Sequence, residues 1–384
     1  MSFDFSSASR ILFGKGFLNK LPELGKENGR KPFVVTGSGK ANADLLFDQI
    51  NKIPQDYIKW VVKGEPAIED IRRAVDIARR ENCDYVIGFG GGSVVDSGKA
   101  IAAMLTNSGE IIDYLEGVGK NLPIKNLSAP FIAIPTTSGT GSEVTRNAVL
   151  SVPEKKVKVS MRSPLMIPKI ALIDPLLTCS LSPEVTAYTG MDALTQVIEP
   201  YVSMKRNGFT DIFCMEGIKM AAKSLIRAYH DGNDTDARED MSWVSLLGGL
   251  SLANAGLGMV HGFAGPIGGM FHAPHGAICA SLLPAVVEMN IKALLIREPK
   301  NEALERYSEI ASILSGKENV EISDAWMYLR NLISDLKIPG LRDYGIKKIH
   351  FDEIIGSAQN ASSTKGNPIA LNKEELISIL EMAY

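Results

Sequence analysis

The stretch that decides the fold is DYVIGFGGGSVVDSGKAIAAML, residues 84–105 of a 384-residue chain. It begins with a short apolar run, passes through Gly90–Gly92, and continues from Ser93 with the small apolar residues of a buried helix. A buried strand that turns through glycines directly into a helix is typical of a parallel sheet with helices on both faces. We therefore expect an α/β domain around this stretch.

Similar units lie on both sides of this stretch in the first half of the chain. Apolar runs of strand length occur in RILFG, KPFVVTGSGKAN, PFIAIPTTSGTGSEVT and IALIDP. The spacing predicts strands at 33–36, 58–62 and 131–134, and helices at 18–29, 43–50 and 68–81. Strands that alternate with helices predict a Rossmann-like parallel sheet.

The second half of the chain has a different periodicity. After IALIDP, apolar residues recur mainly at helical spacing, which predicts an all-helical domain. The predicted helices cover residues 185–202, 209–228, 243–255, 278–289, 302–315, 323–336 and 373–384. We place the change near Asp174 and Pro175, with an α/β nucleotide-binding domain at 1–176 and a helical metal-binding domain at 177–384.

Composition restricts the class of protein. The formal net charge is -3 and no block of Lys or Arg occurs, so nucleic acid is not an expected partner. The apolar runs look too short to cross a bilayer, and the N-terminus lacks the pattern of a signal peptide, so no membrane association is expected. The four cysteines form no CxxC pair, which favours a reducing cytoplasm and cysteines that act as small buried hydrophobes.

The glycine loop is a candidate site for a dinucleotide. Glycines between a strand and a helix let a pyrophosphate approach the backbone N–H groups at the helix N-terminus, and Ser93 is a candidate N-cap. The match to GxGxxG is imperfect, because Ser93 occupies the third glycine position, and a packed turn without a ligand is the alternative. The second loop, PTTSGTGSE at 135–143, would lie at the same end of the sheet.

The end of the predicted strand at 33–36 bears on the choice of nucleotide. NAD sites usually place an acidic residue on the adenosine ribose, whereas Gly37, Ser38 and Lys40 stand here. A glycine leaves room, and Ser or Lys suits a 2′-phosphate. The pattern favours NADP(H) over NAD(H), with an ordinary turn as the alternative.

Two later segments form a candidate metal site. NAGLGMVHGFAGPIGGMFHAPHG, residues 254–276, holds His261, His272 and His275 in what we expect to be a glycine-rich loop. In TGMDALTQVIEPYVS, Asp192 and Gln196 are four residues apart and share one helix face. Two imidazoles and a carboxylate suit Fe²⁺ or Zn²⁺, which would polarise an alcohol or aldehyde oxygen. His272 could replace His275, and Asp192 could simply be an acid in the first turn of a helix.

These four motifs, in this order, resemble the iron-containing (group III) alcohol dehydrogenases. The resemblance runs from RILFG to LLP at 282–284 and becomes loose afterwards. It implies a dehydroquinate synthase-like fold, with a Rossmann-like N-terminal domain and a helical C-terminal domain. It also implies NAD(P)-dependent interconversion of small alcohols with aldehydes or ketones at Fe²⁺ or sometimes Zn²⁺. We expect a cytoplasmic homodimer or higher homo-oligomer.

The resemblance assigns roles to individual residues. The metal ligands of the family fall on Asp192, His261 and His275, which makes them the expected catalytic centre. The residues expected to contact the nucleotide are Gly90, Gly91, Gly92 and Ser93 in the first loop, Asp96 and Lys99 in the helix after it, Thr136, Thr137, Thr140 and Ser142 in the second loop, and Lys158 and Leu177 further on. Members that prefer NADP often have glycine at the position of Gly37.

Two departures from the family pattern leave the chemistry open. Gln196 stands where the family has a fourth metal histidine, although its amide oxygen can still add a neutral ligand, and Gly265 stands where it has a histidine near the nicotinamide. Alternatives are an enzyme like dehydroquinate synthase, one like the zinc-dependent glycerol dehydrogenases, and a nucleotide-binding homologue with altered catalysis.

Overall fold

The computed structural model describes residues 3–39, 42–155, 157–271 and 273–384. These residues form two compact units. The α/β unit comprises Ser6–Thr137 and Gly141–Leu181, and the helical unit comprises Ser182–Tyr384, Ser138–Thr140 and the segment that ends at Phe5.

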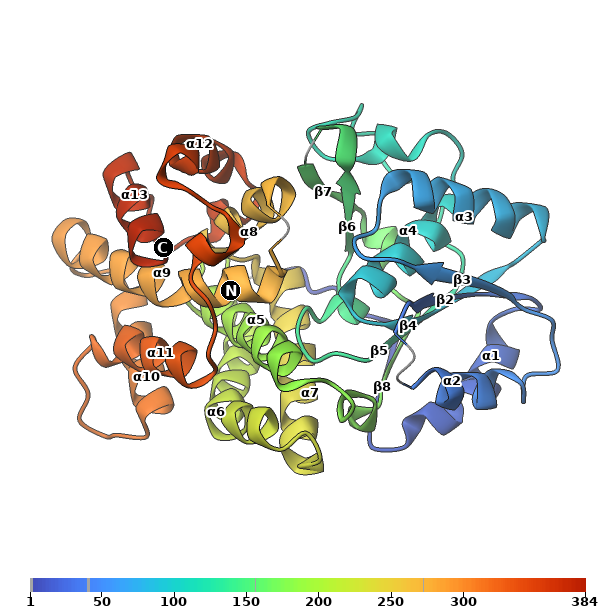
Figure 1. Cartoon of the computed structure of the whole chain (residues 1–384), viewed down its shortest axis with the longest axis horizontal. Coiled ribbons are helices and arrows are strands. Elements are labelled where there is room, and N and C mark those ends of the chain that lie inside the picture. The colour runs from blue at the N-terminus through green and yellow to red at the C-terminus, as the bar shows by residue number, and fades with distance from the viewer. Residues whose placement is uncertain (1–2, 40–41, 156, 272) are drawn as a thin grey trace. The chain divides into compact units, whose positions relative to one another are not determined.

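A six-stranded sheet forms the centre of the α/β unit within the described residues (Figure 1). Its order is β1-β8-β5-β4-β2-β3, and every neighbouring pair is parallel. The strands are β1 (Arg10–Phe13), β2 (Pro32–Gly37), β3 (Ile58–Val62), β4 (Tyr85–Gly90), β5 (Phe131–Pro135) and β8 (Ile170–Ile173). The predicted Rossmann-like sheet is confirmed.

Both faces of this sheet are covered by helices, because successive strand residues point to opposite sides. On β2, Phe33 and Val35 join the apolar core under α3 (Ile68–Arg80) and α4 (Gly92–Thr106). Val34, between them, joins the core under α1 (Leu21–Asn28) and α2 (Ala43–Ile50). This explains why the strand sequences are continuous apolar runs.

An antiparallel hairpin in the α/β unit was not predicted. Strands β6 (Asn147–Val152) and β7 (Val157–Arg162) pair over their full lengths. Side chains of α4 hold the hairpin, since Asp96 Oδ2 accepts the Val149 N–H at 2.9 Å. Buried and more exposed residues alternate along β6, but the exposed Val149 is apolar, so the sequence shows this alternation only weakly.

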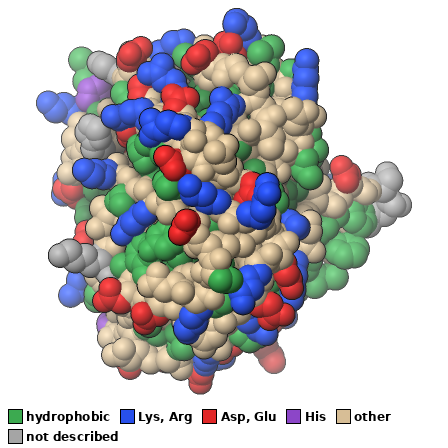
Figure 2. All heavy atoms as spheres, turned by 90° about the vertical axis from the view of Figure 1, so that its right-hand side faces the viewer, with side chains coloured by type: hydrophobic (Ala, Val, Ile, Leu, Met, Phe, Trp, Pro, Cys, Tyr) green, Lys and Arg blue, Asp and Glu red, His purple; other side chains and the backbone are tan. Residues whose placement is uncertain are grey.

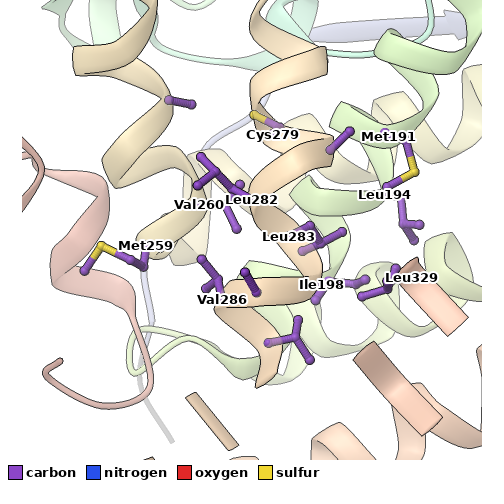
Figure 3. Packing of buried hydrophobic residues seen from close by; sticks show 14 of the residues in the cluster. Met191, Leu194, Ile198, Met259, Val260, Cys279, Leu282, Leu283, Val286 and Leu329 are labelled. Carbon is purple, nitrogen blue, oxygen red and sulfur yellow. The ribbon is translucent and has the colours of Figure 1, made fainter. Parts of the chain in front are cut away.

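The helical unit contains all seven predicted helical segments. Its helices are α5 (Pro183–Val202), α6 (Gly208–His230), α7 (Thr235–Ala255), α8 (Met259–Met270), α9 (His275–Arg297), α10 (Ala303–Ser315), α11 (Asp324–Asp335), α12 (Phe351–Asn360) and α13 (Lys373–Met382). They enclose one large apolar cluster, part of which is drawn in Figure 3. Helices α8 and α12 were not predicted.

The expectation of a glycine-rich loop at 254–276 was wrong, because most of this segment is helix α8. Its glycines serve close packing rather than tight turns. A Cβ on Gly262 would lie 2.2 Å from Thr364 Oγ1, and one on Gly276, in the first turn of α9, would lie 2.1 Å from the Tyr188 carbonyl oxygen. Tertiary packing therefore outweighs the low helix propensity of glycine here.

Helix α9 is long and apolar enough to span a membrane by length and composition, contrary to the expectation that every apolar run is too short. However, 83% of its apolar 18-residue window is buried inside the protein, as in the core helix of a helical domain.

Charged side chains of both signs are interspersed on the face seen in Figure 2, in keeping with the small net charge.

Two helix glycines with opposite surroundings test the packing of α4 on the sheet. A Cβ on Gly98 would lie 2.5 Å from the Phe131 ring of β5, whereas a Cβ on Gly356 in α12 meets nothing within 4 Å. Gly98→Ala is therefore expected to lower the thermal midpoint, since overpacking costs about 1–3 kcal/mol. The control Gly356→Ala should raise stability by about 0.5–1 kcal/mol. Equal effects of the two substitutions would contradict the packing described.

Candidate metal centre and nucleotide-binding edge

Four side chains of the helical unit meet at one point. Asp192 comes from α5, His261 from the first turn of α8, and His275 and Cys279 from the first two turns of α9. One ligand atom of each lies within 4.8 Å of the other three. The Asp192 Oδ1 atom is 3.4 Å from His261 Nε2 and 3.8 Å from His275 Nε2. The structure thus brings the three predicted metal ligands together.

The surroundings of Asp192 are suited to a cation. Its Oδ1 atom is buried and has no hydrogen-bond partner among the described residues. A buried carboxylate oxygen without a partner costs several kcal/mol unless a cation neutralises it. Among the described residues, the ion pairs of Asp192 and Glu199 are formed with imidazoles alone. The donor set, and a carboxylate oxygen without a hydrogen bond, together fit a divalent metal ion.

Glu199 orients one of the imidazoles. It lies two helical turns after Asp192 on α5, and its Oε2 atom accepts a hydrogen bond from His261 Nδ1 at 2.6 Å. Because a carboxylate can only accept, the Nδ1 atom carries a proton, and metal binding would use the lone pair of Nε2. Carboxylate–histidine–metal arrangements of this kind fix the ring orientation and raise ligand basicity. Sequence reasoning missed Glu199, although its spacing from Asp192 was visible.

The carboxylate of Glu199 also binds the backbone just before His261. Glu199 Oε1 accepts the Val260 N–H at 2.7 Å, and Asn367 Oδ1 accepts the Met259 N–H at 3.2 Å. A Cβ on Gly258 would lie 2.8 Å from Glu199 Oε1, so a larger residue where the chain enters α8 would displace this carboxylate. These contacts place His261 before any ligand binds.

The charged groups of the cluster shift one another's pKa values. Burial by itself lowers the pKa of His275, but Cys279 and Asp192 beside it raise the pKa to about 9. Burial would raise the pKa of Cys279, but His275 and His261 lower it below its usual value. The expectation that every cysteine acts only as a buried hydrophobe is incomplete for Cys279. The signal was its position four residues after His275 on one helix face.

Gln196 is buried on α5 between Asp192 and Glu199. Its Nε2 atom donates to the Gly139 carbonyl at 2.9 Å, so the amide holds the second predicted loop at that residue. The role of Gln196 as a ligand stays a prediction.

Two other predicted positions lie in the segment 254–276. His272 lies outside the described residues. A Cβ at Gly265 would meet nothing within 4 Å, so a side chain would have room there.

The predicted nucleotide residues of the α/β unit gather at the carboxyl edge of its sheet. Strands β2, β4 and β5 are neighbours, with Thr36 paired to Phe89 and Gly90 to Pro135. Their carboxyl ends therefore bring Gly37, the glycine loop and Thr136 to one edge. Strand β3 lies beyond β2 on the other side, so the strand order reverses between β2 and β4. Ligands of open α/β sheets bind at such a reversal.

The glycine loop has little space for larger residues. A Cβ on Gly90 would lie 2.5 Å from Val94 Cγ2, and one on Gly91 would lie 3.3 Å from Thr137 Cγ2. The prediction that Ser93 caps the helix was wrong. The N-cap of α4 is Gly91, without a side-chain cap, and helix residues begin at Gly92. A helix start without a side-chain cap leaves backbone N–H groups for an anionic ligand.

Several predicted nucleotide residues form hydrogen bonds and ion pairs with other residues of the α/β unit. Asp96 Oδ1 accepts the Ser142 hydroxyl at 2.5 Å and is 3.2 Å from Lys99 Nζ. Lys99 is fully buried, which lowers its pKa, and its Nζ atom donates to Thr145 Oγ1 at 2.8 Å. Lys158 pairs with Glu65 at 3.0 Å. Asp96 and Lys99 thus tie the second loop and the hairpin to α4.

The remaining predicted residues differ in exposure. Ser38 is exposed, Gly37 is partly exposed, and a Cβ on Gly37 would meet only Val94 Cγ2 at 3.6 Å. Thr137 and Thr140 are partly exposed. Leu177 is 2% exposed and packs in the core under α2. Lys40 lies outside the described residues.

Comparisons with known proteins cover nearly the whole chain. Residues 8–175 match the family "Iron-containing alcohol dehydrogenase", and residues 186–384 match "Fe-containing alcohol dehydrogenase family, C-terminal". The chain belongs to the iron-containing alcohol dehydrogenases.

Individual relatives in sequence and structure are also named as alcohol or butanol dehydrogenases. Alcohol dehydrogenase 4 of Saccharomyces cerevisiae (strain ATCC 204508 / S288c) is 36% identical, over 97% of this chain and 96% of its own. The NADPH-dependent butanol dehydrogenase of Clostridium saccharobutylicum is 33% identical, over 99% of this chain and 97% of its own. The structure of an alcohol dehydrogenase from Oenococcus oeni superposes with a TM-score of 0.91 at 34% identity, and each chain is fully covered.

As an iron-containing alcohol dehydrogenase, the protein is an NAD(P)- and metal-dependent oxidoreductase that transfers hydride between nicotinamide and an alcohol or carbonyl substrate. The synthase-like and catalytically altered alternatives are not favoured by these matches.

The carboxylate behind His261 can be tested by metal affinity. Glu199→Gln keeps the size of the side chain but removes its charge, so the dissociation constant of the bound metal should rise about 10–100-fold. Competition with a chromophoric chelator measures this constant. Glu184→Gln is the control, because Glu184 lies on the same helix and only accepts from the Tyr188 hydroxyl at 3.0 Å. Unchanged affinity in Glu199→Gln would contradict the role of Glu199.

Proposed function

We propose that this alcohol dehydrogenase prefers NADP(H), holds Fe²⁺ or Zn²⁺ with Asp192, His261 and His275, and interconverts small alcohols and aldehydes. The observation that supports the metal site most strongly is the buried Asp192 Oδ1 atom, which has no hydrogen-bond partner among the described residues and faces two imidazole nitrogens. Gln196, which is buried one turn after Asp192, is a candidate for a neutral ligand.

When bound, a nicotinamide would supply hydride transfer and a metal ion held by Asp192, His261 and His275 would supply Lewis acidity toward the substrate oxygen. The protein side chains supply position. Asp192 and His261 are nearly buried, at 4% and 7% side-chain exposure, whereas His275 is 41% exposed. Substrate therefore approaches the cluster on the His275 side.

Proton transfer does not depend on a side chain at residue 265. Gly265 offers no acid or base, and the space beside it is open. We propose that the alcohol proton leaves through water in this space or through nucleotide hydroxyls.

The preference for NADP(H) is supported by the carboxyl end of β2. An acidic side chain at residue 37 would bind ribose hydroxyls and repel a 2′-phosphate. Gly37 is not required by the fold, because a Cβ there makes only an ordinary contact at 3.6 Å. The butanol dehydrogenase relative is named as NADPH-dependent, and other relatives act on 1,3-propanediol, which supports small alcohols as substrates.

Gly37→Asp tests the nucleotide preference without disturbing the packing. The introduced carboxylate should reduce kcat/KM for NADPH by about tenfold or more, since placing like charges together costs about 1.4 kcal/mol or more. Activity with NADH should be retained or rise. Gly37→Asn has nearly the same shape without the charge and should keep the preference for NADPH. Identical kinetics of both variants with NADPH would show that residue 37 does not read the 2′-phosphate.

The function is tested with a panel of small aldehydes and alcohols. Metal-depleted protein is reloaded anaerobically with Fe²⁺ or Zn²⁺ and assayed with NADPH and NADH. We expect metal-dependent oxidation of NADPH with at least one aldehyde, and its loss in Asp192→Asn. No turnover with any combination of metal, nucleotide and substrate would refute the proposal.

Location and assembly are also proposals. All four cysteines are free, which supports a reducing cytoplasm. Exposed apolar residues near the start of α6, including Met204, Phe209 and Ile212, support self-association into a homodimer or larger oligomer. Light scattering of the eluted protein measures the mass, and a monomer at micromolar concentration would contradict this assembly.

A further inference from the structure

We propose that Cys279 is the fourth protein ligand of the metal ion and that the site therefore prefers zinc to iron. This inference rests on the proposed metal site of Asp192, His261 and His275. It concerns a residue that sequence reasoning treated only as a buried hydrophobe.

The distances between donor atoms fit tetrahedral coordination. A zinc ion with Zn–S of about 2.3 Å and Zn–N or Zn–O of about 2.0–2.1 Å separates sulfur from nitrogen by about 3.6 Å, and nitrogen from oxygen by about 3.3 Å. The Cys279 Sγ atom lies 3.6 Å from His275 Nε2 and 3.9 Å from His261 Nε2. The two imidazole nitrogens lie 3.8 and 3.4 Å from Asp192 Oδ1. The separations already approach those of one four-ligand site.

A hydrogen bond alone accounts for less of this arrangement. A thiol can donate to one nitrogen and accept from the other, but both are weak hydrogen bonds, and the two Nε2 atoms lie 3.6 and 3.9 Å from Cys279 Sγ. His261 is already fixed by Glu199 through Nδ1, which leaves Nε2 for the cluster. A shared cation satisfies the sulfur and both nitrogens together.

Helix α9 places the Cys279 thiol on the same face as His275. His275 and Cys279 are separated by four residues on α9 and therefore share one face. Figure 3 shows Cys279 at one end of a column of apolar side chains on α9 that continues through Leu283 and Val286. The core thus holds the sulfur rigidly at its border with the polar cluster.

Gln196 is the other candidate for the fourth ligand. Its amide nitrogen already donates to the Gly139 carbonyl at 2.9 Å, so the amide has a structural role on that side. The amide oxygen stays available, but zinc sites in proteins are built from thiolate, imidazole and carboxylate donors, so we assign Cys279 to the metal and Gln196 to the loop.

The choice of donor atom determines the metal. Thiolate is a soft ligand that favours Zn²⁺ over harder ions, and Zn²⁺ also binds nitrogen and oxygen donors more tightly than Fe²⁺ does. With four protein ligands, substrate would bind as a fifth ligand, a coordination number that catalytic zinc sites sometimes adopt.

The experiment detects the metal–sulfur bond by spectroscopy. Wild-type protein is depleted of metal and titrated with Co²⁺, which should produce a thiolate-to-cobalt charge-transfer band in the near ultraviolet at one ion per chain. Zinc X-ray absorption of the wild type should show a sulfur neighbour at about 2.3 Å. Cys279→Ala should lose the band and bind zinc at least about tenfold more weakly, the lower end of what loss of a metal-site contact costs.

Two variants serve as controls. Cys214→Ala removes another fully buried cysteine of the same unit and should keep the band. Gln196→Leu should also keep it. The proposal is overturned if Co²⁺ binds at one ion per chain without the band, or if the band persists in Cys279→Ala.

The outcomes separate this inference from the proposed function. Metal-dependent turnover without a metal–sulfur bond would remove Cys279 from the site and leave the function intact. Failure to bind Co²⁺ and Zn²⁺ at all would overturn both.

Discussion

The helical unit depends on how two buried carboxylates are neutralised. Asp192 and Glu199 lie on one face of α5, at 3% and 5% exposure, and within the described part of the chain their ion pairs are all with imidazoles. Burial of such charges in an apolar interior is costly unless a cation or protons compensate them. Helices α8 and α9 meet this requirement, because α8 contributes His261 and α9 contributes His275 beside these acids.

Close contact of helix backbones makes this site possible. The start of α9 touches α5 at Gly276, where a Cβ would lie 2.1 Å from the Tyr188 carbonyl oxygen. The neighbouring residue, His275, is thereby brought within reach of Asp192. Gly258 does the same for the start of α8, since a larger residue would collide with Glu199. Glycines at these two helix starts permit the close approach of the helices that carry His261 and His275.

Much of the α/β unit was predictable because its signals are local. The strands and helices follow from apolar runs, glycine turns and helical periodicity, all of which act over a few residues. The β6/β7 hairpin was missed because its strands alternate only weakly, and the contact that holds it comes from Asp96 on α4. Helix α8 was missed because glycine and proline normally indicate turns, and only its packing reveals why they are tolerated.

The sequence by itself determined the family and the two kinds of domain, and it singled out Asp192, His261 and His275 as candidate ligands, because these inferences depend on residue types at recognisable spacing. It also located the glycine loop, since a strand followed by glycines and a helix is a local pattern. The tertiary structure alone decided that Glu199 supports His261, that Cys279 faces both imidazoles, and that Gln196 binds Gly139. These contacts join residues from separate helices, and periodicity along one chain segment carries no information about which faces will meet.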